Sequence, residues 1–98
     1  MEELMSAIKA SMRIRHTALD ADIISNIEAA AADMVRAGVQ PYSDAAGQVL
    51  KDDPLIKKAA ELYCKYQADY MEKGAQFEKS YEKLRDSMSL CGDYNESG

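Results

Sequence analysis

The chain has 98 residues, with 12 lysines and arginines against 17 aspartates and glutamates, and a net charge of -5. This length predicts one domain with a single modest core, residues 1-98, and leaves little room for a deep cleft between lobes. The acidic balance argues against a protein that grips nucleic acid phosphates through a basic surface.

The overall composition is that of an ordinary soluble globular protein. Hydrophobic residues make up 47% and charged residues 30%, and no apolar run is long enough to cross a membrane. The first residues, Met1 to Met5, are acidic where a secretory leader would be basic, so we expect the chain to stay in a reducing cytoplasm. Cys64 and Cys91 are then expected to be free thiols, with Cys64 as a small core residue.

Helical spacing of apolar residues, without convincing strand alternation, predicts an all-α fold. We expect a small bundle of about four helices with one longer loop at residues 39-53. The first helix should run from Glu2 to about Met12 and bury one apolar face. That face holds Leu4, Met5, Ile8 and Met12.

The second predicted helix covers residues 17-37. Thr17 is the expected N-cap, and Asp20 and Asp22 fall in the first turn, where the helix dipole favours carboxylates. Gly38 supplies a left-handed stop. The wide apolar face predicted for this helix consists of Ile23, Ile24, Ile27, Ala30, Ala31, Met34 and Val35.

The loop at residues 39-53 is punctuated by Pro41 and Gly47. Its apolar members are more numerous than a solvated loop requires. We therefore expect Tyr42, Val49 and Leu50 to pack on the core or on a neighbouring subunit.

The third predicted helix begins at Pro54, with Asp52 or Asp53 as its N-cap, and runs to about Tyr70. Its apolar residues form two adjacent stripes, which predicts a central helix contacted from more than one side. These residues are Leu55, Ile56, Ala59, Ala60, Leu62, Tyr63, Tyr66 and Tyr70.

The last predicted helix begins near Ala75, after a break at Gly74, and carries one apolar seam. The seam consists of Phe77, Tyr81, Leu84 and Met88. Apolar residues continue beyond it at Leu90, Cys91 and Tyr94, which is unusual for a free terminus. Residues 89-98 are therefore a predicted docking tail.

The sequence contains no recognisable catalytic constellation. His16 has no motif that links it to a nucleophile, and the pairs Asp20/Asp22 and Asp52/Asp53 are explained by their places at helix starts. No phosphate loop or metal-ligand spacing is present. We therefore expect no enzymatic activity, no cofactor and no metal.

Three segments resemble the small head-tail connector (adaptor) proteins of long-tailed bacteriophages and prophages, which are also called DNA-packaging proteins. They are the stretch from Met12 to Ala30, the helix start from Asp53 to Lys57 and its aromatic continuation, and the closing segment from Phe77 to Tyr94. The resemblance covers nearly the whole chain. It consists of helices and their boundaries, and it contains no catalytic signature.

The resemblance implies a structural virion protein at the head-tail junction, assembled in the host cytoplasm. Its copies would form a homo-oligomeric ring under the portal protein, extend the channel for double-stranded DNA without reading its sequence, and support a downstream connector or tail protein. On this reading Met88, Leu90 and Tyr94 would contact the portal or a neighbouring subunit. Tyr42, Val49 and Leu50 would form contacts between subunits.

The alternative is a small helical DNA-binding or regulatory protein. It would use the helix predicted at residues 17-37 and the basic pair Arg13 and Arg15. A recognition helix presents arginine, lysine, asparagine or glutamine to the bases, whereas this one offers chiefly acidic residues and alanines. The charge therefore favours the connector.

Overall fold

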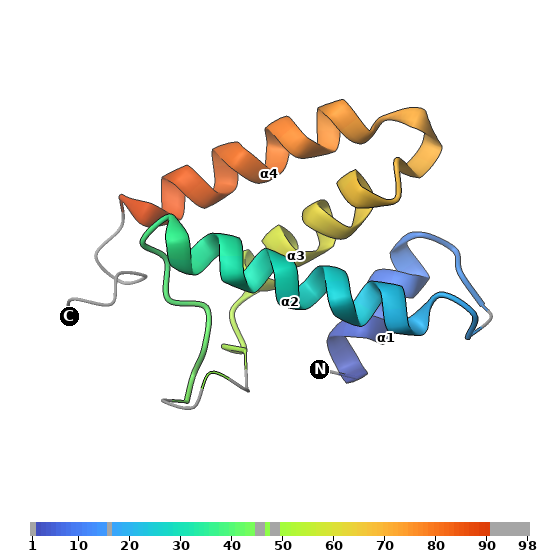
Figure 1. Ribbon diagram of the computed structural model, residues 1–98, viewed down its shortest axis with the longest axis horizontal. Coiled ribbons are helices and arrows are strands. Elements are labelled where there is room, and N and C mark those ends of the chain that lie inside the picture. Colours follow the sequence, from blue (N-terminus) through green and yellow to red (C-terminus); the bar gives the residue numbers. More distant parts are fainter. Residues whose placement is uncertain (1, 16, 45–46, 48–49, 91–98) are drawn as a thin grey trace.

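The computed structural model describes residues 2-15, 17-44, 47 and 50-90. Its helices are α1 (Glu2–Ser11), α2 (Asp20–Arg36), α3 (Pro54–Gln67) and α4 (Gly74–Ser89), with the short 3-10 helix η1 (Tyr70–Glu72) before α4. Within these residues there is no strand, and one isolated antiparallel bridge joins Tyr42 to Leu50. The predicted all-α bundle with one long loop is confirmed (Figure 1).

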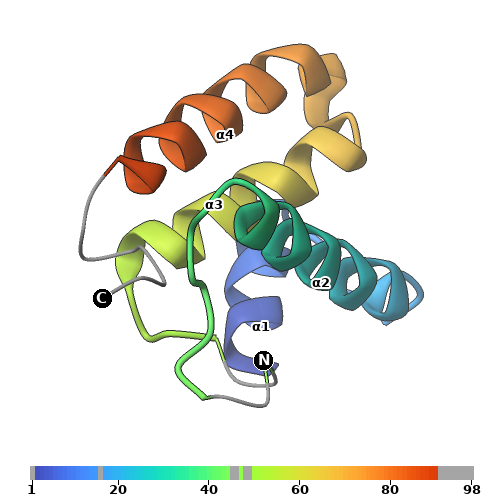
Figure 2. The same ribbon diagram turned by 60° about the vertical axis from the view of Figure 1, so that its left-hand side comes forward.

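The third helix, α3, is central, as its two apolar stripes predict. It contacts α1, α2 and α4, and α1 and α4 lie on opposite sides of it (Figures 1 and 2). The buried residues form two clusters that both include α3. One joins α2, α3 and α4 through Ala30, Met34, Val39, Ile56, Ala59, Leu62, Tyr81 and Met88. The other joins α1, α2 and α3 through Ile8, Met12, Ile23, Ile27, Ala60 and Cys64.

The start of α3 agrees with its sequence signal. Asp53 has an extended backbone, and its Oδ1 atom accepts hydrogen bonds from the amides of Leu55 at 2.8 Å and Ile56 at 3.3 Å. Pro54 occupies the first helical position, where its missing N-H costs nothing. The predicted cap is therefore confirmed for Asp53.

The start of α2 differs from the prediction, because Thr17 does not cap it. The helix begins at Asp20, and Leu19 stands at the N-cap without a side-chain hydrogen bond. The carbonyl of Thr17 instead accepts from the amide of Asp20 at 3.1 Å, in a turn that precedes the helix. Lys9 of α1 donates to Asp20 Oδ1 at 2.6 Å, so a tertiary contact holds this end of the helix.

Two left-handed residues end the first two helices. Gly38 has φ 92° after α2, which confirms its predicted role as a stop. After α1 the same conformation falls on Arg13, with φ 59°. The amide of Ile14 then donates to the Lys9 carbonyl at 2.8 Å, across five residues as in a Schellman motif. An arginine therefore holds a position that favours glycine.

The connection from α3 to α4 is a tight corner in which Asp69, Met71 and Glu72 all have positive φ. Asp69 Oδ1 accepts from the amide of Gly74 at 2.8 Å, which ties the start of α4 to the end of α3. A Cβ atom on Gly74 would lie 2.6 Å from Asp69 Oδ1 and 3.2 Å from the Tyr66 carbonyl oxygen. Only glycine fits this corner without a shift.

We expect Gly74→Ala to lower the free energy of unfolding by about 1–3 kcal/mol through this overpacking, although alanine usually favours a helix by about 1 kcal/mol. Urea unfolding would measure the change. Gln76→Ala, an exposed position in the same turn, is the control and should leave stability nearly unchanged. The double variant Asp69→Gly with Gly74→Ala should recover part of the loss; a stabilised Gly74→Ala would contradict the close approach.

Candidate functional site

Three acidic residues at or just before helix starts have partners within the chain. Asp20 binds Lys9, Asp52 pairs with Lys57, and Asp53 caps α3. In the part of the chain that the structure describes, no group of three or more histidine, cysteine or acidic side chains is placed to hold a metal ion. His16 lies outside that part. No helix among residues 2-15, 17-44 and 50-90 is long and apolar enough to span a bilayer.

Cys64 is a core residue, as predicted. Its side chain is 1% exposed, and its Sγ atom lies 4.0 Å from the Ile23 carbonyl oxygen. Burial, followed by the nearby Glu61 carboxylate, raises the pKa of the thiol to about 12. Such a thiol is unreactive at neutral pH. Cys91 lies outside the described residues.

The residues expected to meet a partner at the C-terminal end fall into different environments. Met88 is 2% exposed and belongs to the buried cluster of α2, α3 and α4, so a partner cannot reach its side chain in this conformation. The expectation for Met88 is thereby corrected: it continues the apolar seam of α4 into the core. Leu90 follows the helix and is 87% exposed. Tyr94 lies outside the described residues.

Two further apolar side chains are exposed, contrary to the sequence expectation that both pack inward. Val35 is 45% and Leu55 is 42% exposed. Their helical neighbours Met34 and Ile56 share one cluster with Met88, so Val35, Leu55 and Leu90 lie at the same end of the bundle. This set, Val35, Leu55 and Leu90, is called the α4 end surface below.

Two apolar residues of the long loop, Tyr42 and Leu50, lie opposite each other. Tyr42 and Leu50 form the isolated bridge, and the Lys51 amide donates to the Pro41 carbonyl at 2.8 Å. Both Tyr42 and Leu50 are half-buried, and Leu50 packs against the cluster that joins α1, α2 and α3. Each keeps part of its surface accessible. Val49 lies outside the described residues.

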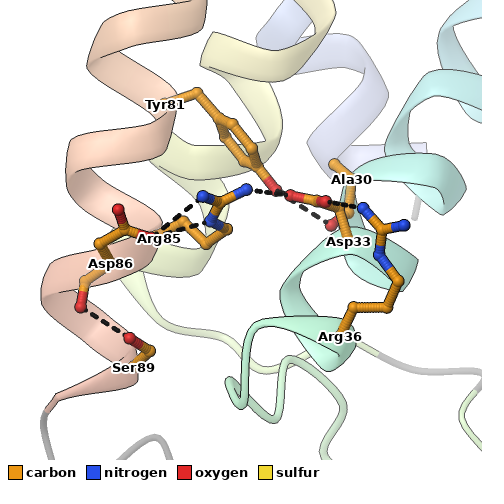
Figure 3. A network of polar contacts seen from close by, with 7 residues as sticks. All are labelled: Ala30, Asp33, Arg36, Tyr81, Arg85, Asp86 and Ser89. Atoms are coloured by element: carbon orange, nitrogen blue, oxygen red, sulfur yellow. Dashed lines mark hydrogen bonds and ion pairs between the residues drawn. The ribbon is translucent and has the colours of Figure 1, made fainter.

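A polar network centred on Asp33 joins α2 to α4 (Figure 3). The Tyr81 hydroxyl donates to Asp33 Oδ2 at 2.6 Å and lies 3.4 Å from the Ala30 carbonyl oxygen. Arg85 Nη1 donates to the same carboxylate at 2.9 Å, and Arg36 donates to Oδ1 at 2.7 Å. The carboxylate side chain is 16% exposed. One acidic residue therefore holds a tyrosine and two arginines.

The network changes the titration of its members. Partial burial raises the pKa of Asp33, but hydrogen bonds from Tyr81, Arg85 and Arg36 outweigh it and hold the pKa below its ordinary value of 3.8. Burial, and then the hydrogen bond to Asp33, raises the pKa of Tyr81. The hydrogen bond to Asp33 also raises the pKa of Arg85. At neutral pH Asp33 is thus a carboxylate and Tyr81 a neutral donor.

Beside this network lies an open groove of about 260 Å³ between α2, α3 and α4. Two tyrosines of α3, Tyr63 and Tyr66, line it, with their rings edge to face at 5.8 Å. Glu78 and Glu82 of α4 line it as well, and a hydrogen bond with Glu78 raises the pKa of Tyr66. We call Tyr63, Tyr66, Glu78 and Glu82 the tyrosine-carboxylate groove.

Tyr81 lies on the apolar seam of α4 as predicted, but its polar partners Asp33 and Arg85 are not predicted from the sequence. Asp33 and Arg85 are 52 residues apart, and each is one of several charged residues on its amphipathic helix. A signal was available in α4, because Tyr81 and Arg85 are four residues apart and share one face. That face needs an acceptor on a neighbouring helix.

The comparisons with known proteins give one finding. The family model described as phage connector protein matches residues 4-95, nearly the whole chain. No curated protein and no solved structure matches the chain significantly. The chain therefore belongs to the phage connector protein family, a family of structural proteins.

Proposed function

We propose that this chain is the subunit of a head-tail connector ring in the virion. Copies assemble beneath the portal vertex, extend the DNA channel and support attachment of the tail. The observation that carries the proposal is the family match over residues 4-95, which spans every helix of the bundle almost completely. Assembly takes place in the host cytoplasm before the particle is released.

The α4 end surface is the proposed contact with the portal. Isolated exposed leucines are common on proteins, but Leu90 is 87% exposed and lies at the same end of the bundle as Val35 and Leu55. Residues 91-98 follow Leu90 in the sequence, and Tyr94 among them supplies an aromatic side chain of the kind enriched at interfaces. Burial of these groups against the portal would remove apolar surface from water.

The folded loop is the proposed contact between neighbouring subunits. Tyr42 and Leu50 present half-exposed apolar surface on a segment that the antiparallel bridge holds in place. Val49, next to Leu50, is assigned to the same contact. The bridge and the hydrogen bond from Lys51 to Pro41 fix the positions of Tyr42 and Leu50, so these residues lose less conformational entropy when they bind.

DNA is proposed to pass through the ring without sequence-specific binding. The net charge of -5 disfavours tight binding to phosphates. The exposed face of α2 bears Asp22 and Glu28 beside Ser25 and Ala29, and two carboxylates would repel a DNA backbone. This acidic face argues against the alternative function, a small DNA-binding or regulatory protein. Salt-sensitive binding of duplex DNA by the isolated protein would support that alternative instead.

Leu90→Ser tests the proposed portal contact. We expect about a tenfold weaker association with portal particles, corresponding to roughly 1.4 kcal/mol, measured by sedimentation of mixtures with portal. Met71→Ser is the matched control, because Met71 is 67% exposed and precedes α4, at the end opposite to Leu90. Deletion of residues 89-98 should weaken binding further.

The same sedimentation runs give the mass of the connector alone and with portal. Ring-sized particles in either sample support the proposed assembly. A chain that is strictly monomeric in both samples would overturn it, and equal binding by Leu90→Ser and the unaltered chain would remove the α4 end surface from the portal contact.

A further inference from the structure

We infer that the tyrosine-carboxylate groove of one copy binds the α1–α2 loop of the next copy, with Arg13 and Arg15 as the groups that enter it. The inference rests on the proposed ring. It adds a contact between charged residues to the apolar contact that the loop is proposed to make between subunits. The occupant of the groove is a second copy of this chain.

The groove has two carboxylates without a cation. Glu78 and Glu82 are four residues apart on α4, where like charges destabilise a helix. Neither forms an ion pair with any residue that the structure describes. Tyr63 and Tyr66 form the facing wall. Aromatic rings beside carboxylates are the setting that a guanidinium group favours.

The other charged residues of the groove bind one another. Asp33 is bound by both Arg36 and Arg85. With Glu78 and Glu82, the groove lining holds three carboxylates and two arginines. Its net charge is therefore about -1 at neutral pH, and Glu78 and Glu82 are its carboxylates outside any ion pair among the described residues.

The chain already binds a cation in this manner within one subunit. Lys65 Nζ lies 5.6 Å from the ring centres of both Tyr70 and Phe77 and 3.6 Å from Glu61 Oε2. That site also joins aromatic rings to a carboxylate, and there the cation is supplied internally. The groove on α3 and α4 also contains Arg36 and Arg85, but both bind Asp33, and no described residue forms an ion pair with Glu78 or Glu82.

The α1–α2 loop supplies the missing charge. Arg13 and Arg15 are both exposed, and neither forms an ion pair within the described part of the chain. They line an open hollow at the end of α1 with Ile14 and Lys9. Arg13 also occupies the left-handed position after α1, which glycine would occupy with less strain. The arginine therefore needs an explanation other than the stability of this turn.

A copy cannot fill its own groove with its own loop. The loop precedes the first residue of α2, while Asp33 and Arg36 beside the groove belong to its last turn. A helix of 17 residues is about 25 Å long. The contact therefore joins unlike surfaces of two copies, and repeated contacts of that type close into a ring when the rotation permits.

The test compares particle formation, by sedimentation, for the unaltered chain and for charge variants, alone and with portal. Arg13→Gly should preserve or raise the urea midpoint while raising the protein concentration required for particles about tenfold, since an interfacial charge is lost. Arg13→Glu with Arg15→Glu should prevent assembly. Glu78→Arg with Glu82→Arg should do the same, and all four changes in one chain should restore particles.

The control is Lys79→Glu with Lys83→Glu, which changes the charge of α4 by the same amount in the opposite direction, at exposed positions that do not line the groove. This variant should assemble normally. Particles that form normally after either charge reversal overturn the inference and leave the proposed ring intact. Failure of the fourfold variant to assemble, with an unaltered urea midpoint, overturns the pairing of loop and groove. Absence of particles for the unaltered chain overturns the ring and this contact together.

Discussion

Met88→Ala should lower the free energy of unfolding by about 2–5 kcal/mol, the range for truncation of a buried methionine. Met88 is 2% exposed and packs in the cluster that joins α4 to α2 and α3. Its truncation leaves a cavity between three helices as well as removing apolar contact. Urea unfolding followed by circular dichroism measures the loss.

Leu90→Ala is the control for this measurement, because it truncates an apolar side chain two residues away that is 87% exposed. Its stability should change by less than about 0.5 kcal/mol. The two variants separate core packing from partner binding on one helix. A Met88→Ala protein with unchanged stability and weakened portal binding would reverse the assignment and return Met88 to the interface.

Asp33→Ala should cost about 2–3 kcal/mol of stability, because it leaves the hydroxyl of Tyr81 and the guanidinium of Arg85 without their shared acceptor. Both groups lie partly out of water, so water does not replace the lost hydrogen bonds fully. Asp86→Ala is the matched control. It also removes a carboxylate that binds Arg85, at 3.1 Å, but that side chain is 63% exposed, and its loss should cost less than about 0.5 kcal/mol.

The pH dependence gives a second measurement of the same network. The pKa of Asp33 is lower in the folded chain than its ordinary value of 3.8, so its ionised form stabilises the fold. The stability difference between the unaltered chain and Asp33→Ala should be constant near neutral pH. It should shrink as the pH falls below 3.8 and through the folded-state pKa. A difference that stays constant through this acidic range would exclude ionised Asp33 as the centre of the network.

Local signals in the sequence predict most of the fold. The predicted roles of Asp53 as N-cap and Pro54 as first helical residue are confirmed, because a cap and a fixed φ depend only on residues within one turn. The same holds for Gly38, and the two apolar stripes of α3 predict its central place. The prediction of Thr17 as the N-cap of α2 is wrong, because the start of this helix is held instead by the contact of Lys9 with Asp20, two residues 11 apart on different helices. Local helix propensity cannot predict a contact between two helices.

The candidate surfaces are less predictable than the helices. Met88, at a seam position, and Leu90, just beyond the helix, are both apolar, and only the packing distinguishes 2% from 87% exposure. Glu78 and Glu82 look like an ordinary solvated face until Tyr63 and Tyr66 of α3 are placed opposite them. The charge of the groove depends on residues from three helices. The periodicity of one helix therefore cannot predict it.

The placement of two buried clusters on either side of α3 has a consequence for how the domain opens. The cluster under α1 and the cluster under α4 have no member in common, and α1 and α4 lie on opposite sides of the central helix. Either outer helix can detach while the other cluster stays closed. Because α2 and α3 contribute residues to both clusters, we expect their amide protons to exchange more slowly than those of α1 and α4.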